Sequence, residues 1–232
     1  MTPAPAQLST TETMTARLRA ARVVPVITID DPDNAVPLAR ALSAGGLSCA
    51  EITFRTPRAV EAIRRISAEA PDLLAGAGTV LTPAQVDAAR DAGAQFVVAP
   101  GFNPRVVEHC QSVGLPVYPG IATPSEIEAA LELGLTTLKF FPAEPMGGLG
   151  FLKAIAAPFV GVTFMPTGGI SATNVAAYLS FDRVVACGGS WMAPADWIAA
   201  KQFDRIREES RRASDVAHGR AQAAAAPAGA FT

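Results

Sequence analysis

Lys139 has the clearest chemical potential in this sequence, because it stands inside the apolar run 136–142, which otherwise predicts a buried strand. The chain has only three lysines. A charged ammonium is costly in an apolar core, so such a lysine pairs with an anion or loses its proton. A neutral lysine amine is a nucleophile that forms a Schiff base with a carbonyl compound. The alternative is a lysine with a buried stem whose charge reaches water at the strand end.

A second apolar segment supplies a partner for this lysine. Glu51, Thr53 and Arg55 alternate along the chain, so they share one face of a predicted strand. If Glu51 and Lys139 project into one site, they can share a proton, and each changes the ionisation of the other. The alternative is a buried ion pair without chemistry, but such pairs stabilise proteins weakly. Arg55 offers forked donors that suit a planar carboxylate.

Two glycine pairs close the last two predicted strands. Gly168 and Gly169 follow one of them, and Gly188, Gly189 and Ser190 end the other. Such pairs expose backbone N–H groups, and a following helix adds the positive end of its dipole. In parallel barrels the loops after the seventh and eighth strands commonly bind phosphate. The pairs therefore predict a phosphate site, and a simple tight turn is the alternative.

The segments that position these residues alternate between short apolar runs and helical patterns. Strands are predicted at residues 23–29, 49–54, 73–79, 96–101, 116–121, 136–141, 163–169 and 183–190. Helical patterns lie at 36–44, 57–68, 83–92, 104–113, 124–133 and 172–179, and several open with Thr-Pro or Asn-Pro. Eight such units predict an α/β protein with a (β/α)8 TIM barrel rather than an open doubly wound sheet.

The two ends of the chain have a different pattern. A short helix is predicted at residues 9–20, where it could plug the floor of the barrel, and a last helix at 194–213. We expect residues 1–213 to form a single domain. Residues 214–232 are rich in alanine and nearly lack bulky apolar side chains, so we expect a disordered tail.

Composition argues against several classes of function. The net charge is −2 without a basic stripe, which argues against nucleic acid and anionic membranes as partners. No apolar run approaches the ~18 residues of a membrane span. Three widely spaced cysteines favour free thiols in a reducing compartment, so we expect a cytoplasmic protein. The two histidines have no metal-ligand spacing with acidic residues, and we predict neither a metal nor a cofactor.

Five motifs together carry a family resemblance. They are residues 51–57 (EITFRTP), 76–80 (GAGTV), 139–144 (KFFPAE), 166–170 (PTGGI) and 188–191 (GGSW). In this combination they resemble 2-keto-3-deoxy-6-phosphogluconate (KDPG) aldolase, also called 4-hydroxy-2-oxoglutarate (KHG) aldolase. The resemblance covers residues 23–203 in order, and the motifs lie on five of the eight predicted strands.

The resemblance implies a role for each residue of the motifs. Lys139 is expected to form the Schiff base, and Glu51 to act as the general acid and base. The expected substrate contacts are Arg55 and Thr79 for the pyruvyl carboxylate, Pro100 and Phe141 for the pyruvyl pocket, and Gly168, Gly169, Gly189 and Ser190 for the phosphate. Thr167, directly before the glycine pair, is our candidate for contacting the C4 hydroxyl. The family resemblance also implies a homotrimer.

These observations predict a class I aldolase that acts on a small phosphorylated sugar acid. Its expected reaction cleaves 2-dehydro-3-deoxy-6-phosphogluconate to pyruvate and D-glyceraldehyde 3-phosphate, and 4-hydroxy-2-oxoglutarate to pyruvate and glyoxylate. One alternative is an aldolase for the C4 epimer, 2-dehydro-3-deoxy-6-phosphogalactonate. The presence of Arg55 argues against this alternative. Others are a phosphosugar isomerase or epimerase on the same barrel, and a phosphate-binding scaffold with a dead site, although Lys139 and Glu51 are both present.

Overall fold

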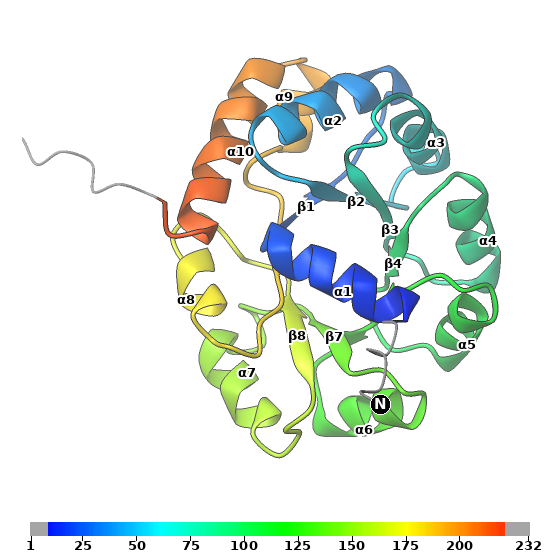
Figure 1. Ribbon diagram of the computed structural model, residues 1–232, viewed down its shortest axis with the longest axis vertical. Coiled ribbons are helices and arrows are strands. Elements are labelled where there is room, and N and C mark those ends of the chain that lie inside the picture. The colour runs from blue at the N-terminus through cyan, green and yellow to red at the C-terminus, as the bar shows by residue number, and fades with distance from the viewer. Residues whose placement is uncertain (1–8, 221–232) are drawn as a thin grey trace, which may run out of the picture.

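The computed structural model describes residues 9–220, in which parallel strands are surrounded by helices (Figure 1). The strands are β1 Val23–Ile27, β2 Cys49–Thr53, β3 Leu74–Gly78, β4 Phe96–Val98, β5 Val117–Tyr118, β6 Gly120–Ile121, β7 Thr137–Phe140, β8 Thr163–Pro166 and β9 Cys187–Gly189. The helices are α1 Thr10–Ala21, η1 Pro32–Asn34, α2 Ala35–Ala44, α3 Ala59–Glu69, α4 Pro83–Asp91, α5 Pro104–Ser112, α6 Pro124–Glu132, α7 Gly148–Ala156, α8 Val175–Leu179, α9 Ala195–Ala199 and α10 Phe203–Ala217.

The strands form two curled parallel sheets. One has the order β5-β4-β3-β2-β1-β9, and the other has the order β6-β7-β8. Pro119, which has no N–H to donate, separates β5 from β6 within the single strand predicted at 116–121. Two isolated parallel bridges, Phe164 with Val184 and Thr167 with Gly188, connect β8 and the loop after it to β9 and the segment before it. The predicted α/β class with parallel strands is confirmed.

Several strands alternate between an outer and an inner apolar cluster. Ile27 and Ile52 belong to the outer cluster, which the strands share with the surrounding helices. Phe96 belongs to the inner cluster, together with Met14 and Leu18 of α1. Figure 1 shows α1 lying across the strands, as expected for a helix that covers the floor. A capping box between Ser9 and Glu12 starts this helix close to the predicted position.

The helix starts follow the predicted Thr-Pro and Asn-Pro signals. Thr82, Asn103 and Thr123 each accept a hydrogen bond from a backbone N–H of the following helix, and a proline stands next in each case. Helix α7 was not predicted. It begins at Gly148 within the sequence Gly-Gly-Leu-Gly, and glycine has a low intrinsic helix propensity.

The C-terminal part of the chain differs from the prediction. The single helix expected at 194–213 is two helices, α9 and α10, and α10 continues to Ala217. The domain boundary expected after residue 213 therefore falls inside a helix. Ser214 is buried and donates a hydrogen bond to the Gly46 carbonyl, so this turn of α10 packs at the end of α2. The last residues of the expected tail, 221–232, lie outside the described part of the chain.

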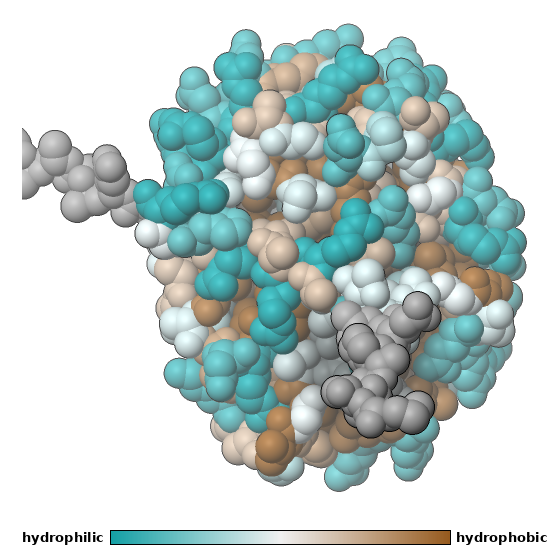
Figure 2. Space-filling view, in the orientation of Figure 1, coloured by the Kyte–Doolittle hydropathy of each residue, from teal (hydrophilic) through white to brown (hydrophobic). Residues whose placement is uncertain are grey.

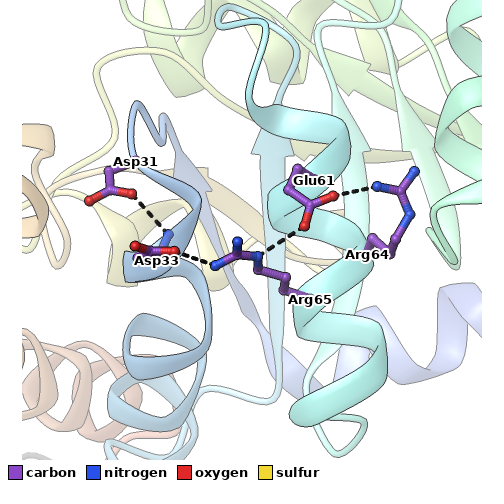
Figure 3. A network of polar contacts seen from close by, with 5 residues as sticks. All are labelled: Asp31, Asp33, Glu61, Arg64 and Arg65. Atoms are coloured by element: carbon purple, nitrogen blue, oxygen red, sulfur yellow. Dashed lines mark hydrogen bonds and ion pairs between the residues drawn. The ribbon is translucent and has the colours of Figure 1, made fainter.

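The surface of the described residues is mixed in character. Figure 2 shows the face that carries α1, where hydrophilic and hydrophobic residues are interspersed. Between η1 and α3, Arg65 pairs with both Asp33 and Glu61, and Glu61 also pairs with Arg64 (Figure 3). Exposed pairs of this kind contribute little stability, about 0–1 kcal/mol each. Within residues 9–220, no helix is long and apolar enough to cross a membrane.

Ser210 on α10 gives a prediction about stability. Its hydroxyl is fully buried and has no hydrogen-bond partner among residues 9–220, where α10 packs closely against Gly45. Ser210→Ala should raise the free energy of unfolding by about 1 kcal/mol, because it removes an unsatisfied polar group and alanine favours helices. Ser214→Ala is the control, and loss of its hydrogen bond to the Gly46 carbonyl should lower the free energy of unfolding by about 1 kcal/mol. Urea unfolding measures both, and equal destabilisation would show that Ser210 has a hydrogen-bond partner.

Candidate active site

Lys139 and Glu51 meet inside the curled sheets. Lys139 Nζ lies 3.5 Å from Glu51 Oε1, and the two residues are only 5% and 2% exposed. They come from β7 and β2, which belong to different sheets, so the contact crosses the interior. The Nζ atom also lies 5.1 Å from the centroid of the Phe141 ring. A buried amine and carboxylate at this distance can exchange a proton, as the spacing along each strand predicted.

The glycines of β3 leave room for the Glu51 side chain. Gly78 lies on the strand beside β2, and a Cβ atom there would be 2.2 Å from Glu51 Oε1. A Cβ atom at Gly76 would lie 2.2 Å from the ring of Phe96. Both glycines therefore face the interior, where any larger residue would collide. The available sequence signal was the period of two, because Gly76 and Gly78 alternate with Ala77 along the strand.

Thr79 follows directly after Gly78 with an unfavourable backbone conformation. Its φ angle is 58°, which is a left-handed conformation that β-branched residues rarely adopt. Hydrogen bonds on both sides hold the turn, from Phe54 N–H to the Gly78 carbonyl and from Val80 N–H to the Val98 carbonyl. Strain of this kind tends to be retained at binding and catalytic sites. The half-buried Thr79 thus lies next to the glycine that accommodates Glu51.

Arg55 and Ser190 share one small cavity. Its volume is about 270 Å³, and Thr28 and Pro194 also line it. Arg55 is exposed, and within residues 9–220 no carboxylate lies within 4 Å of its guanidinium. Arg55, predicted for the substrate carboxylate, and Ser190, predicted for the phosphate, therefore open into one space, which neither Lys139 nor Glu51 lines. A larger cavity of about 850 Å³ lies beside α1, and neither Lys139 nor Glu51 lines it.

The two glycine turns lie side by side, joined by the bridge between Thr167 and Gly188. Gly168 and Gly169 have φ angles of 100° and 81°, which favour glycine strongly. A Cβ atom at Gly188 would lie 2.3 Å from Thr167 Oγ1, so the turns also need glycine for their close approach. Helix α8 has only five residues and begins at Val175, later than predicted, so the helix dipole contributes less to anion binding than the sequence indicated.

The remaining predicted residues lie around the same end of the strands. Phe141 directly follows β7 and is half-buried near Lys139. Thr167 directly follows β8, is buried, and donates its N–H to the Phe140 carbonyl at 2.9 Å. Pro100 lies two residues after β4, and its carbonyl oxygen would be 2.1 Å from a Cβ atom at Gly120. Gly120 pairs with Lys139, so Pro100 lies one strand away from the lysine.

Comparison with known proteins identifies the family. The family model for KDPG and KHG aldolase matches residues 14–209. The chain belongs to the KDPG and KHG aldolase family. The 2-dehydro-3-deoxy-phosphogluconate aldolase of Treponema pallidum is 53% identical over 199 residues, which cover 86% of this chain and 95% of that protein. The KHG/KDPG aldolase of Escherichia coli K12 is 46% identical over 195 residues, which cover 84% of this chain and 92% of that protein.

A solved structure of the same family matches the fold. The KDPG aldolase from Legionella pneumophila, with pyruvate captured at low pH as a covalent carbinolamine intermediate, is 40% identical with a TM-score of 0.82. The match covers 85% of this chain and 96% of that one. The resemblance seen in the five sequence motifs is therefore confirmed at the level of the family.

Gly78→Ala tests whether this glycine makes space for Glu51. The added methyl group collides with the Glu51 carboxylate, so the free energy of unfolding should fall by about 1–3 kcal/mol. Gly161→Ala is the control, because a Cβ atom there meets no neighbour within 4 Å in the described part of the chain. Its free energy of unfolding should stay within about 0.5 kcal/mol of the parent value. Urea unfolding of both variants provides the measurement. An equally stable Gly78→Ala variant would mean that Glu51 has another conformation.

Proposed function

We propose that this protein is a metal-independent class I aldolase that cleaves KDPG to pyruvate and D-glyceraldehyde 3-phosphate. The observation that carries the proposal is the buried contact between Lys139 and Glu51. The names of the relatives and the pyruvate adduct of the Legionella pneumophila enzyme support the same reaction. KHG is a second substrate, cleaved to pyruvate and glyoxylate, and the name of the Escherichia coli relative supports this activity.

Lys139 supplies the electron sink for the reaction. The neutral amine adds to the C2 carbonyl of the substrate to give a carbinolamine, which loses water to form a protonated imine. Glu51, 3.5 Å away, is placed to accept a proton from Nζ and to return it during these steps. Because both groups are shielded from solvent, their attraction is screened less than at the surface. Transfer of a proton from Nζ to Glu51 leaves the neutral amine that attacks the substrate carbonyl.

Glu51 then moves the protons of C–C cleavage. Its carboxylate takes the proton of the C4 hydroxyl, directly or through a water molecule, and the C3–C4 bond breaks. The electron pair of that bond passes to the imine and gives a neutral enamine, while the aldehyde leaves. Glu51 returns the proton to C3, and hydrolysis of the resulting imine releases pyruvate and frees Lys139. One carboxyl group thus serves as base and acid in turn.

The surrounding residues bind the two anionic ends of the substrate. Arg55 and Thr79 hold the pyruvyl carboxylate, Pro100 and Phe141 form the walls of the pyruvyl pocket, and Thr167 contacts the C4 hydroxyl. The phosphate site consists of Gly168, Gly169, Gly189 and Ser190. The cavity shared by Arg55 and Ser190 supports this arrangement, because it joins one residue proposed for the carboxylate to one proposed for the phosphate. The strained backbone of Thr79 supports a binding role for that residue.

Further features belong to this proposal. The eight βα units close into a single-domain (β/α)8 barrel, and the two isolated bridges from β8 and its loop toward β9 support the closure.

Cys49, Cys110 and Cys187 are free and buried, which fits a reducing cytoplasm. The homotrimer is part of the proposal, and it rests on the family resemblance alone. We do not propose the epimer-specific aldolase or the isomerase, because the relatives above are named for KDPG and KHG.

Covalent trapping tests the role of Lys139. Incubation with pyruvate and borohydride should reduce the imine and add one pyruvyl group to the protein, on Lys139 alone. Lys153 and Lys201 are internal controls, and Lys139→Arg should abolish trapping because a guanidinium does not form the imine. Peptide mapping by mass spectrometry locates the adduct. An adduct on another lysine, or none at all, would refute the mechanism.

Glu51→Gln tests the proton transfers. The amide keeps the shape of the carboxyl group but accepts no proton, so turnover of KDPG should fall by about 100-fold or more. Trapping of pyruvate should survive in part, because the amine of Lys139 is still present. Steady-state kinetics and trapping are measured on the same preparation. A variant that turns over at nearly the parental rate would remove Glu51 from this role.

A further inference from the structure

A carboxylate beside the proposed site has no part in the mechanism above. Glu144 lies in the loop between β7 and α7, and it accepts a hydrogen bond from the hydroxyl of Tyr178 on α8. Tyr178 is only 2% exposed. Burial, and then the bond to Glu144, raise the pKa of the Tyr178 phenol well above its usual value. The hydroxyl therefore keeps its proton and remains a donor at neutral pH.

Glu144 also packs directly on the glycine turn after β8. Its backbone N–H donates to the Gly168 carbonyl at 3.0 Å, and the N–H of Ala143 donates to the Thr167 carbonyl at 2.8 Å. A Cβ atom at Gly169 would lie 2.6 Å from the Glu144 Cβ. The side chain of Glu144 therefore fills the space beside Gly169, and the backbone of its loop runs along the turn.

The turn depends on such support from outside. Two consecutive glycines with positive φ have many alternative conformations, so a fixed arrangement of their N–H groups costs conformational entropy. The loop after β7 restrains the turn from one side. On the other side, Asn174 Nδ2 donates to the Gly169 carbonyl at 3.0 Å. Tyr178 anchors the Glu144 side chain from a buried position in α8. The hydrogen bond between them therefore holds Glu144, and with it the loop after β7, in place against the turn.

We infer that the hydrogen bond from Tyr178 to Glu144 is a positioning contact, which holds the Gly168-Gly169 turn in the conformation that binds a phosphate group. It sets the affinity for the phosphorylated end of the substrate and touches none of the reacting atoms. The inference rests on the proposed function for the identity of the phosphorylated substrate. It also links the loop after the Lys139 strand to the phosphate site, since Glu144 follows the lysine by five residues.

Tyr178→Phe tests this contact, because it removes the hydroxyl and keeps the ring. The KM for KDPG should rise about tenfold, the change that corresponds to one lost hydrogen bond to a charged group. The kcat for KDPG, the KM for the unphosphorylated KHG and the trapping of pyruvate should each change by less than about twofold.

Tyr118→Phe is the matched control. Tyr118 is also a buried tyrosine whose hydroxyl has a hydrogen bond to one side chain, that of Thr15 in α1. Its removal should leave the KM for KDPG unchanged. Glu144→Gln keeps an acceptor oxygen and should bind KDPG nearly as well as the parent, whereas Glu144→Ala should match Tyr178→Phe. An equal loss of affinity for KDPG and KHG in Tyr178→Phe would indicate general structural damage and overturn the inference.

Binding of inorganic phosphate separates this inference from the proposed function. Titration followed by ³¹P NMR should give a dissociation constant about tenfold weaker for Tyr178→Phe than for the parent and for Tyr118→Phe. If the parent binds phosphate but does not cleave KDPG, the proposed function fails while the phosphate data still test the contact. Equal dissociation constants in Tyr178→Phe and the parent, or no binding of phosphate to the parent, would overturn the inference.

Discussion

The structure depends on a contact between two buried opposite charges. Lys139 and Glu51 are almost fully shielded from water, and their partial desolvation costs free energy that their attraction recovers only in a favourable geometry. Strands β7 and β2 provide that geometry, because neighbouring strands hold each backbone on both sides. A site built on rigid strands keeps the amine and the carboxylate at a distance suited to proton transfer, while a loop would let them separate.

The site is formed as much by missing side chains as by present ones. Gly78 leaves space for the Glu51 carboxylate, Gly120 lets the Pro100 carbonyl approach, and Gly188 accommodates Thr167. Glycine within strands carries an entropic cost and contributes no packing, so its use on interior faces needs a compensating reason. Here the reason is steric, because each of these three glycines admits a group that belongs to the site or supports it. Gly169 has the same role, because the Glu144 side chain occupies the space that a Cβ atom at Gly169 would need.

Most elements were predictable because their signals are local. Apolar runs marked the strands, and the Thr-Pro and Asn-Pro pairs marked helix starts such as Thr82 and Thr123. Helix α7 was missed because its first turn is rich in glycine, which favours no helix by itself. The end of α10 was missed for a related reason. Ser214 and Ala217 show little apolar pattern, and both are buried by tertiary contacts. Ser214 donates to the Gly46 carbonyl at the end of α2, and the Ala217 carbonyl accepts from Arg22.

Within a strand, the sequence by itself determined which residues share a face, since the period of two puts Glu51 in line with Thr53 and fixes Lys139 on its own strand. Arg55, predicted on the same face, follows β2 in a turn. Together with the family motifs, the sequence also predicted the residues of the candidate site. Only the tertiary structure decided the distance between Lys139 and Glu51, the space that Gly78 leaves, and the bond between Tyr178 and Glu144. These contacts join segments far apart in the chain, and alternation within one strand carries no information about the residues that face it across the interior.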